Sequence, residues 1–396
     1  MRAVKISDKV WWVGAIDWTI RDFHGYSTNR GTTYNAYLIM ADKITLIDTV
    51  KAPFKDEMMS RIAQVVDPKK IDYIVSNHSE MDHSGSLPQV IKEVNPERVF
   101  ASAMGKKALA DHFSLNEEIT AVSDGENLSL GNANLTFYET RMLHWPDSMM
   151  TYFDADKLMF SQDGFGMHLA SSERFDDELD EALLKHEAAK YYANILTPYS
   201  GLIKKLLDRV AALNLSIKIV APDHGPVWRT KIDKVLKWYS EWAEQKPTNK
   251  AVIAFDTMWQ STDRMARSIA DGISSAQGSA KVMPIRASHR SEVATELIDA
   301  GAFIVGSPTI NNQMFPTVAD VLTYVKGLKF QNLMGAAFGS YGWSGEGVKL
   351  IQNELSDMKV DIVADSINVK YVPSDEDLKK CFDMGKLIGE KLSNAS

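Results

Sequence analysis

The sequence predicts an α/β protein made of two domains, and three observations support this fold class. Before residue 242, several short apolar runs end on a histidine or an aspartate that is followed by glycine. After residue 250, apolar runs alternate with amphipathic stretches, as in a parallel sheet covered by helices on both faces. The polar stretch between these regions contains a proline and interrupts both patterns. We therefore expect one domain over residues 1–246 and a second over residues 247–396.

The segment 76–85 is the most informative part of the first domain, because four side chains that bind divalent metals occur within six positions. The apolar run 71–75 precedes them and Gly85 follows, which predicts a loop at the end of a buried strand. Such a loop can aim several ligands at one point. A solvated polar loop is the alternative interpretation. The candidate ligands are His78, Glu80, Asp82 and His83.

Three further candidate ligands follow in similar settings. His144 precedes Trp145 and Pro146, which stops an extended segment. Asp163 ends the apolar run 158–162, His224 follows the run 217–222, and each stands directly before a glycine. Taken singly, such a residue at a strand end is more often a turn or capping residue. Because the arrangement recurs, we expect these three residues and the first four to form one two-metal site.

The second domain begins with a strand-like run, 251–255, that leads into a loop rich in hydroxyls before a helix at 264–273. Unpaired N–H groups and the positive end of the helix dipole favour a bound phosphate there. The loop has no lysine, so a Walker-type nucleotide site is not expected. A simple capped helix is the alternative. The candidate phosphate-loop residues are Thr257, Met258, Trp259, Gln260, Ser261 and Thr262.

Two more strand-like runs, 302–306 and 334–338, lead into loops of their own. In a doubly wound parallel sheet, ligands bind beyond the carboxyl ends of the strands. Glycines and aromatic residues at those ends suit a flat ring, although a large aromatic is often only a packed residue. The candidate residues are Ser307, Pro308, Thr309, Asn311 and Asn312 in one loop, and Gly339, Ser340, Tyr341, Gly342 and Trp343 in the other.

The ligand order of the first domain resembles the metallo-β-lactamase-like αββα sandwich, in the variant of the flavodiiron proteins or A-type flavoproteins. The three loops of the second domain resemble those of flavodoxin, so the resemblance covers the whole chain and implies FMN beside Trp259 and Trp343. Segments 14–18, 23–25, 31–37 and 190–196 also look like this family. Hydrolases of the sandwich fold usually carry histidine at the position of Glu80. A carboxylate there favours iron or manganese over zinc.

The resemblance implies two metal positions, with His78, Glu80 and His144 at one, Asp82, His83 and His224 at the other, and Asp163 bridging both. It also implies a soluble reductase. Electrons would pass from an external donor, such as rubredoxin, through FMN to a di-iron centre that reduces dioxygen to water, nitric oxide to nitrous oxide, or both. In some archaeal members the donor is a reduced deazaflavin.

Further expectations from the resemblance concern the surroundings of the metals and the assembly. His24 and one of Tyr191 and Tyr192 would offer hydrogen bonds or protons to the bound gas, and Asp147 would orient a ligating imidazole. A head-to-tail homodimer, or a dimer of dimers, would bring the FMN of one chain close to the metals of the other. Two rival interpretations stay open here. One is a di-zinc hydrolase fused to a flavodoxin-like domain, and the other is an electron-transfer or binding module with a structural metal site.

The composition excludes several other classes of protein. The formal net charge of −8 argues against nucleic acid as a partner. No apolar run approaches the roughly 20 residues that cross a bilayer, and the first residues lack the apolar segment of a secretory signal. We therefore expect a cytoplasmic protein that does not enter a membrane. The single cysteine, Cys381, excludes an internal disulfide and a four-cysteine iron centre.

Two groups of charged or titratable residues carry weaker expectations. Six basic residues are a candidate docking surface for an acidic redox protein, although a solvated helix face is the commoner situation. These six are Lys204, Lys205, Arg229, Lys231, Lys234 and Lys237. Four histidines lack a ligand-like setting, and we expect them to be ordinary polar residues. They are His112, His168, His186 and His289.

Overall fold

The computed structural model describes residues 1–115 and 118–395. Its internal contacts divide the chain into two compact units. The first contains residues 1–24, 28–191 and 201–240, and the second contains residues 25–27, 192–200 and 241–396. The expected division between residues 246 and 247 stays a prediction. Within the part of the chain that the structure describes, no helix is long and apolar enough to cross a bilayer.

The first unit is built on two β-sheets. The larger sheet has the order β1-β2-β7-β8-β9-β10-β11, antiparallel as far as β8 and parallel from β8 onward. Its strands are β1 (Val4–Lys5), β2 (Val10–Trp12), β7 (Tyr37–Ile39), β8 (Thr45–Ile47), β9 (Tyr73–Ser76), β10 (Arg98–Ser102) and β11 (Ile119–Val122). The smaller sheet is antiparallel except for its last, parallel pair. Its strands in order are β12 (Asn127–Ser129), β13 (Asn134–Glu139), β14 (Met149–Phe153), β15 (Leu158–Gln162) and β16 (Ile219–Pro222).

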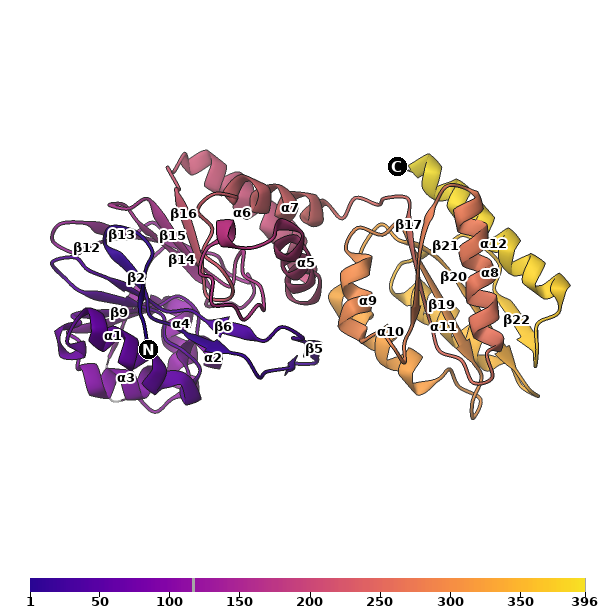
Figure 1. Ribbon diagram of the computed structural model, residues 1–396, viewed down its shortest axis with the longest axis horizontal. Helices are drawn as coiled ribbons and strands as arrows, with labels where there is room; N and C mark the ends of the chain where they lie inside the picture. Colours follow the sequence, from indigo (N-terminus) through magenta and orange to yellow (C-terminus); the bar gives the residue numbers. More distant parts are fainter. Residues whose placement is uncertain (116–117, 396) are drawn as a thin grey trace. The chain divides into compact units, whose positions relative to one another are not determined.

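A buried apolar layer lies between the two sheets, because alternate residues of each strand face the other sheet. Tyr37 and Phe100 come from the larger sheet, and Phe137 and Phe160 come from the smaller one. Helices cover the outer faces, which completes the αββα layering (Figure 1). On the larger sheet these are α1 (Lys55–Val65), α3 (Leu87–Val94) and α4 (Ala103–His112), and on the smaller sheet α6 (Ser200–Leu213).

The remaining elements between residues 15 and 244 lie outside these two sheets, and some of them belong to the second unit. The strands β3 (Ala15–Asp17) and β6 (Thr32–Tyr34) form an antiparallel pair. The others are β4 (Asp22–Phe23), β5 (Tyr26–Ser27), α2 (Met81–Ser84), α5 (Glu181–Tyr191), α7 (Ile232–Glu244), the π-helix η4 (Tyr192–Leu196), and the 3-10 helices η1 (Ala52–Phe54), η2 (Pro68–Lys70), η3 (Asp176–Glu178) and η5 (Thr197–Tyr199).

Most of the second unit is a parallel sheet of order β18-β17-β19-β20-β21, with β22 also paired to β20. Its strands are β17 (Lys250–Phe255), β18 (Ser279–Pro284), β19 (Ala302–Pro308), β20 (Met334–Tyr341), β21 (Asp361–Ile362) and β22 (Ile367–Lys370). Helices cover both faces, which is the doubly wound arrangement expected from the sequence. They are α8 (Ser261–Ser275), α9 (Arg290–Leu297), α10 (Pro316–Leu328), α11 (Glu346–Asp357) and α12 (Asp375–Ala395).

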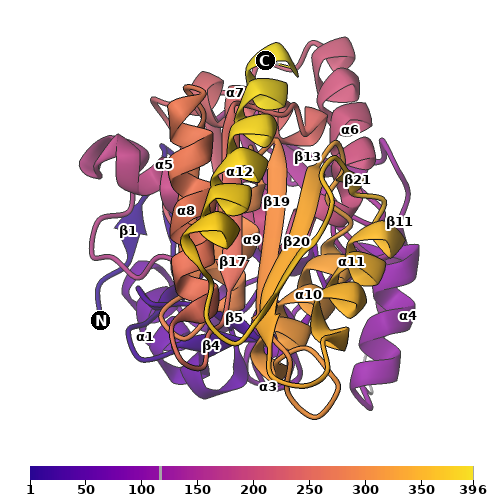
Figure 2. The same ribbon diagram turned by 90° about the vertical axis from the view of Figure 1, so that its right-hand side faces the viewer.

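Helices α8 and α12 lie side by side on one face of this sheet (Figure 2). Glycines allow their backbones to approach closely. A Cβ atom on Gly272 of α8 would lie 2.1 Å from the carbonyl oxygen of Phe382, and one on Gly385 of α12 would lie 2.0 Å from that of Ile269. No ordinary side chain fits these positions, so the two helices can pack at this distance only with glycine there.

We expect Gly272→Ala to destabilise the second unit by about 1–3 kcal/mol, because the added methyl group forces the helices apart. Gly327→Ala is the matched control, since a Cβ on that α10 residue meets nothing within 4 Å. Alanine is the better helix former, so the control should be neutral or slightly stabilising. Urea unfolding followed through flavin fluorescence measures both variants. Equal midpoints for the two would contradict the packing argument.

Candidate functional site

The structure brings all seven predicted metal ligands of the first unit together in two groups. His78, Glu80, His144 and Asp163 offer ligand atoms that all lie within 4.8 Å of one another, and so do Asp82, His83 and His224. His78 and Glu80 lie in the loop after β9, Asp82 and His83 lie in the short helix α2 that follows, and His144 lies in the loop after β13. Asp163 and His224 lie just beyond the ends of β15 and β16. The two sheets therefore deliver ligands to one edge of the sandwich.

Asp163 lies between the two groups and presents one oxygen to each. Its Oδ2 atom is 3.4 Å from Nε2 of His78 and 3.1 Å from Nε2 of His144. Its Oδ1 atom is 3.2 Å from Nε2 of His83 and 3.5 Å from Nε2 of His224. A carboxylate placed in this way can bridge two cations, one on each oxygen.

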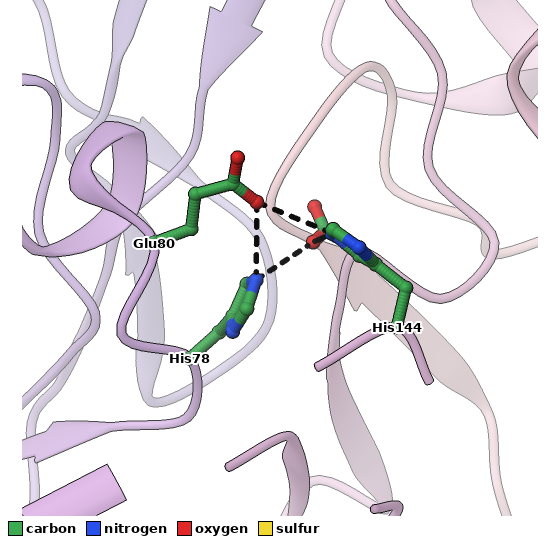
Figure 3. Close-up of side chains that lie close together, drawn as sticks. His78, Glu80 and His144 are labelled. Carbon is green, nitrogen blue, oxygen red and sulfur yellow. Dashed lines mark hydrogen bonds and ion pairs between the residues drawn. The ribbon is translucent and has the colours of Figure 1, made fainter. Parts of the chain in front are cut away.

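Glu80 completes the first group (Figure 3). Its Oε2 atom lies 3.3 Å from Nε2 of His78 and 3.2 Å from Nε2 of His144, and the figure shows the carboxylate pointing toward both rings. In the second group, Asp82 plays the corresponding part. Its Oδ2 atom lies 3.1 Å from Nε2 of His224, and its Oδ1 atom lies 3.4 Å from Nε2 of His83.

The electrostatics of this cluster favour bound positive charge. Burial alone would lower the pKa of His78, but the carboxylates of Asp147 and Glu80 raise it to about 10. Although burial opposes the effect, hydrogen bonds from His144 and His78 hold the pKa of the Glu80 carboxyl below its usual range. The surrounding imidazoles likewise hold the pKa of Asp163 well below its usual value, against the effect of burial. The carboxylates thus stay charged, and divalent cations would balance them.

Outer contacts orient two of the imidazoles so that Nε2 faces the centre of the cluster. The Nδ1 atom of His78 lies 3.1 Å from Oδ2 of Asp147, which also accepts a hydrogen bond from the backbone N–H of Ser79. The Nδ1 atom of His224 lies 2.6 Å from the carbonyl oxygen of Thr33 and donates to it. Such partners fix the tautomer that leaves Nε2 free to bind a metal.

The residues present fit a pair of metal ions. Buried Asp82 Oδ1, His83 Nε2 and Asp163 Oδ1 make no hydrogen bond to any described group, although they lie only 3.2–3.4 Å apart. Unsatisfied polar atoms are costly inside a protein, and shared metal ions would satisfy them. Four imidazoles and three carboxylates form a mixed nitrogen and oxygen donor set that suits iron.

The predicted residues around the ligands lie in different places. His24 has an exposed side chain, and its Nε2 atom is 3.3 Å from Oε1 of Glu80. Tyr191 is buried, and its hydroxyl has its pKa raised well above the usual value by burial and by the nearby Asp163. The hydroxyl of Tyr192 instead lies 3.1 Å from Oγ of Ser200. The structure therefore places Tyr191, and not Tyr192, beside a ligand.

His168, expected to be an ordinary polar residue, lies next to the ligands. Its ring centroid is 4.8 Å from that of His224 and 5.1 Å from that of Tyr191. Burial, reinforced by His224, lowers its pKa well below the usual value, so the ring is neutral. Its Nδ1 atom lies 2.8 Å from Oγ1 of Thr32. The only signal in the sequence is its place in the loop that follows Asp163.

The second unit contains a cavity of about 570 Å³ at the carboxyl ends of its strands. Trp259 and Trp343 line it with side chains that are 85% and 88% exposed, so their rings stand clear of the core. The other lining residues are Met258, Ser261, Pro308, Thr309, Ile310, Asn311, Asn312, Ser340, Tyr341, Gly342, Ser344, Tyr371 and Val372. Most of these residues come from the three loops that the sequence indicated.

Five predicted residues do not line the cavity: Thr257, Gln260, Thr262, Ser307 and Gly339. Some support its walls. The hydroxyl of Thr262 lies 3.4 Å from that of Ser340, and Ser307 accepts a hydrogen bond from the N–H of Phe315. Conversely, Tyr371 and Val372 were missed, because β22 is too short to give a periodic signal.

The cavity fits FMN. Its flat aromatic walls suit an isoalloxazine ring. Next in sequence to the lining residue Met258, Thr257 has a buried hydroxyl without a hydrogen-bond partner among the described residues, and the 15-residue helix α8 begins at Ser261. A free hydroxyl together with a helix N-terminus provides donors for a phosphate group.

Comparisons with known proteins agree with this architecture. Residues 32–225 match the family model described as ODP family beta lactamase, and residues 253–385 match Flavodoxin. The chain is 45% identical to the "Nitric oxide reductase" of Moorella thermoacetica over 99% of both chains. It is 46% identical to the "Rubredoxin-oxygen oxidoreductase" of Megalodesulfovibrio gigas over 99% of this chain and 98% of that one.

A solved structure is also similar to this chain over its whole length. The crystal structure of the flavodiiron protein from Giardia intestinalis superposes with a TM-score of 0.97 and 34% identity, over 100% of this chain and 98% of that chain. The αββα domain and the flavodoxin domain expected from the sequence are therefore confirmed. Since similarity at this level extends over both units, the chain belongs to the flavodiiron protein family.

Proposed function

We propose that this protein is a reductase that takes electrons from an external donor and uses FMN and a non-haem di-iron centre to reduce dioxygen to water, nitric oxide to nitrous oxide, or both. The two-sided position of Asp163 is the observation that carries the proposal, because it gives two metal ions a common ligand. The flavin cavity and the names of the two relatives, one an oxygen reductase and one a nitric oxide reductase, support it.

When bound, FMN supplies one- or two-electron transfer, and the iron pair supplies electrons and a binding site for the diatomic gas. The protein's own groups handle the protons and the water. Tyr191 keeps its proton because its pKa is raised, so it can donate a hydrogen bond close to Asp163. His24 is exposed and close to Glu80, which suits a group that exchanges protons with solvent. The buried ring of His168 packs against the half-buried ring of Phe23, with centroids 4.9 Å apart, and places apolar surface beside the ligands.

The external donor in this proposal is rubredoxin or another small redox protein. The name of the Megalodesulfovibrio gigas relative supports rubredoxin. The six basic residues are a weaker argument than the sequence suggested, because several have partners within the chain. Arg229 forms an ion pair with Asp177, Lys234 forms one with Glu181, and Lys231 donates to backbone carbonyls.

The head-to-tail homodimer, or a dimer of dimers, is part of the same proposal. It rests on the need for a short path between flavin and metals, since the rate of electron transfer falls steeply with distance. Sedimentation velocity at nanomolar concentration, combined with turnover at the same concentration, tests it. A fully active monomer would exclude this assembly.

The comparisons do not favour the alternative of a di-zinc hydrolase fused to a flavodoxin-like domain. The two relatives described above are named as a nitric oxide reductase and a rubredoxin-oxygen oxidoreductase. Glu80 also argues against it, because its carboxylate makes the donor set harder and more anionic than that of a typical zinc hydrolase. Assays for thioester and phosphodiester hydrolysis by the zinc-loaded protein should therefore give no turnover.

The decisive experiment on the function is anaerobic. The protein loaded with iron and FMN is reduced and then mixed with known equivalents of dioxygen or nitric oxide, while flavin absorbance and products are followed. We expect rapid reoxidation of the flavin by at least one gas, with water or nitrous oxide as the product. Slow reoxidation that does not depend on the metals would exclude the reductase.

We expect Glu80→Gln to lower iron affinity and gas turnover by at least about tenfold, because the amide is a weak, uncharged ligand. Iron content after dialysis and turnover with either gas measure the effect. Glu118→Gln is the matched control, since the Glu118 side chain is 88% exposed and is not one of the candidate metal ligands. Wild-type iron content in the Glu80 variant would show that this carboxylate does not bind metal.

We expect Trp343→Ala to weaken FMN binding about 2- to 10-fold, because an aromatic contact contributes about 0.5–1.5 kcal/mol. Fluorescence titration of the flavin-free protein with FMN gives the dissociation constant. Trp18→Ala serves as the control, since this exposed tryptophan belongs to the first unit and does not line the cavity. An unchanged dissociation constant for the Trp343 variant would place the flavin ring elsewhere.

A further inference from the structure

Asp223 is a buried carboxylate with an unusual environment. It follows β16 directly, precedes the ligand His224, and is 0% exposed. Neither of its carboxylate oxygens makes a hydrogen bond to a group in residues 1–115 or 118–395. A fully buried carboxyl group without hydrogen bonds is costly, so its presence calls for a compensating interaction.

The imidazole of His83 is the one basic group within 4 Å of the Asp223 carboxyl group among the described residues. Its Nδ1 atom lies 3.4 Å from Oδ2 of Asp223, and this nitrogen too has no hydrogen-bond partner in the described part of the chain. The opposite nitrogen, Nε2, faces Asp163 at 3.2 Å and Asp82 at 3.4 Å. His83 therefore stands between Asp223 on one side and the cluster of metal ligands on the other.

Asp48 is a buried carboxyl group with a structural role, and it serves as a comparison for Asp223. Asp48 is also buried, at 1% exposed, but its oxygens accept hydrogen bonds from the backbone N–H and the side-chain amide of Asn77 at 2.6 and 2.8 Å. Asp48 thus ties the loop after β8 to the loop after β9. Asp223 has no such backbone contact, so holding a loop in place does not explain it.

We propose that Asp223 is the positioning residue for His83: its carboxylate accepts the Nδ1–H of the imidazole and so holds Nε2 toward the metal position. The proposal rests on the proposed two-metal site. It gives each metal position one histidine that is oriented by a carboxylate, Asp147 for His78 and Asp223 for His83. The contact is long, at 3.4 Å, and a metal held by Nε2 would make the Nδ1–H a stronger donor to Asp223.

The orientation of the His83 ring depends on Asp223, whereas the orientation of His224, the other histidine at this metal position, does not. The Nδ1 atom of His224 is held by the carbonyl oxygen of Thr33 at 2.6 Å, which a side-chain substitution leaves intact. Among the described residues, Asp223 is the only acidic side chain that lies within 4 Å of Nδ1 of His83, and this nitrogen has no hydrogen-bond partner. Loss of its carboxylate should therefore affect one metal position selectively.

The test uses the full-length protein loaded with iron and FMN. Asp223→Asn keeps the shape of the side chain and removes its charge, and Asp223→Ala removes the acceptor altogether. We expect iron affinity at one of the two positions to fall about 10- to 100-fold, with the alanine variant more affected than the asparagine variant. Competition with a chelator measures the affinity, and Mössbauer spectra show whether one iron environment changes while the other persists.

The metal-free proteins separate positioning from a structural role. The unfolding temperature of metal-free Asp223→Asn should equal or exceed that of the wild type, because an uncharged amide costs less to bury at this position than a carboxylate without hydrogen bonds. Metal-free Asp48→Asn should unfold several degrees lower, because an NH2 donor replaces one of the two oxygens that accept hydrogen bonds from Asn77. Unchanged iron affinity in both Asp223 variants, or a fall in metal-free stability like that of the Asp48 variant, would overturn the proposal. Failure of the wild-type chain to bind two irons would instead overturn the proposed function.

Discussion

The mutual neutralisation of buried charge around Asp163 is the constraint on which the first unit depends. Four imidazoles and three carboxylates meet at the edge of the sandwich, and Asp163 faces both groups. Each charged group would be costly to bury alone. Several strands end at the same edge, so that the segments after β9, β13, β15 and β16 place opposite charges within about 3.5 Å of one another.

The second unit differs from the first, because its site depends on exposed aromatic surface and not on the neutralisation of buried charge. Its parallel strands end in three loops and a helix N-terminus, and the two tryptophans that line the cavity are among the most exposed side chains of the chain. Close packing of α8 on α12 through glycines lies away from this edge and holds the scaffold rigid. A packed parallel sheet with exposed aromatic residues at the carboxyl ends of its strands is suited to binding a cofactor that must remain accessible to electrons.

Much of this could be predicted from the sequence, because the signals are local. A strand, a ligand and a glycine follow one another at Asp163 and His224, and the strand-to-loop junctions of the second unit are contiguous in the same way. Features that depend on distance in space were missed. His168 is adjacent to His224 only in the folded chain, and Asp223 looks like an ordinary turn residue until both of its oxygens are seen to lack hydrogen bonds. Tyr371 joins the cavity through a strand too short to recognise.

The measurement that tests the central claim most directly is the magnetic state of the iron-loaded protein. If Asp163 bridges two ions, the protein should bind two irons per chain, and one-electron oxidation of the diferrous form should give an electron paramagnetic resonance signal of a spin-coupled pair. Two irons that behave as independent high-spin ions, or a single iron per chain at saturation, would contradict an account in which one carboxylate organises both metal positions.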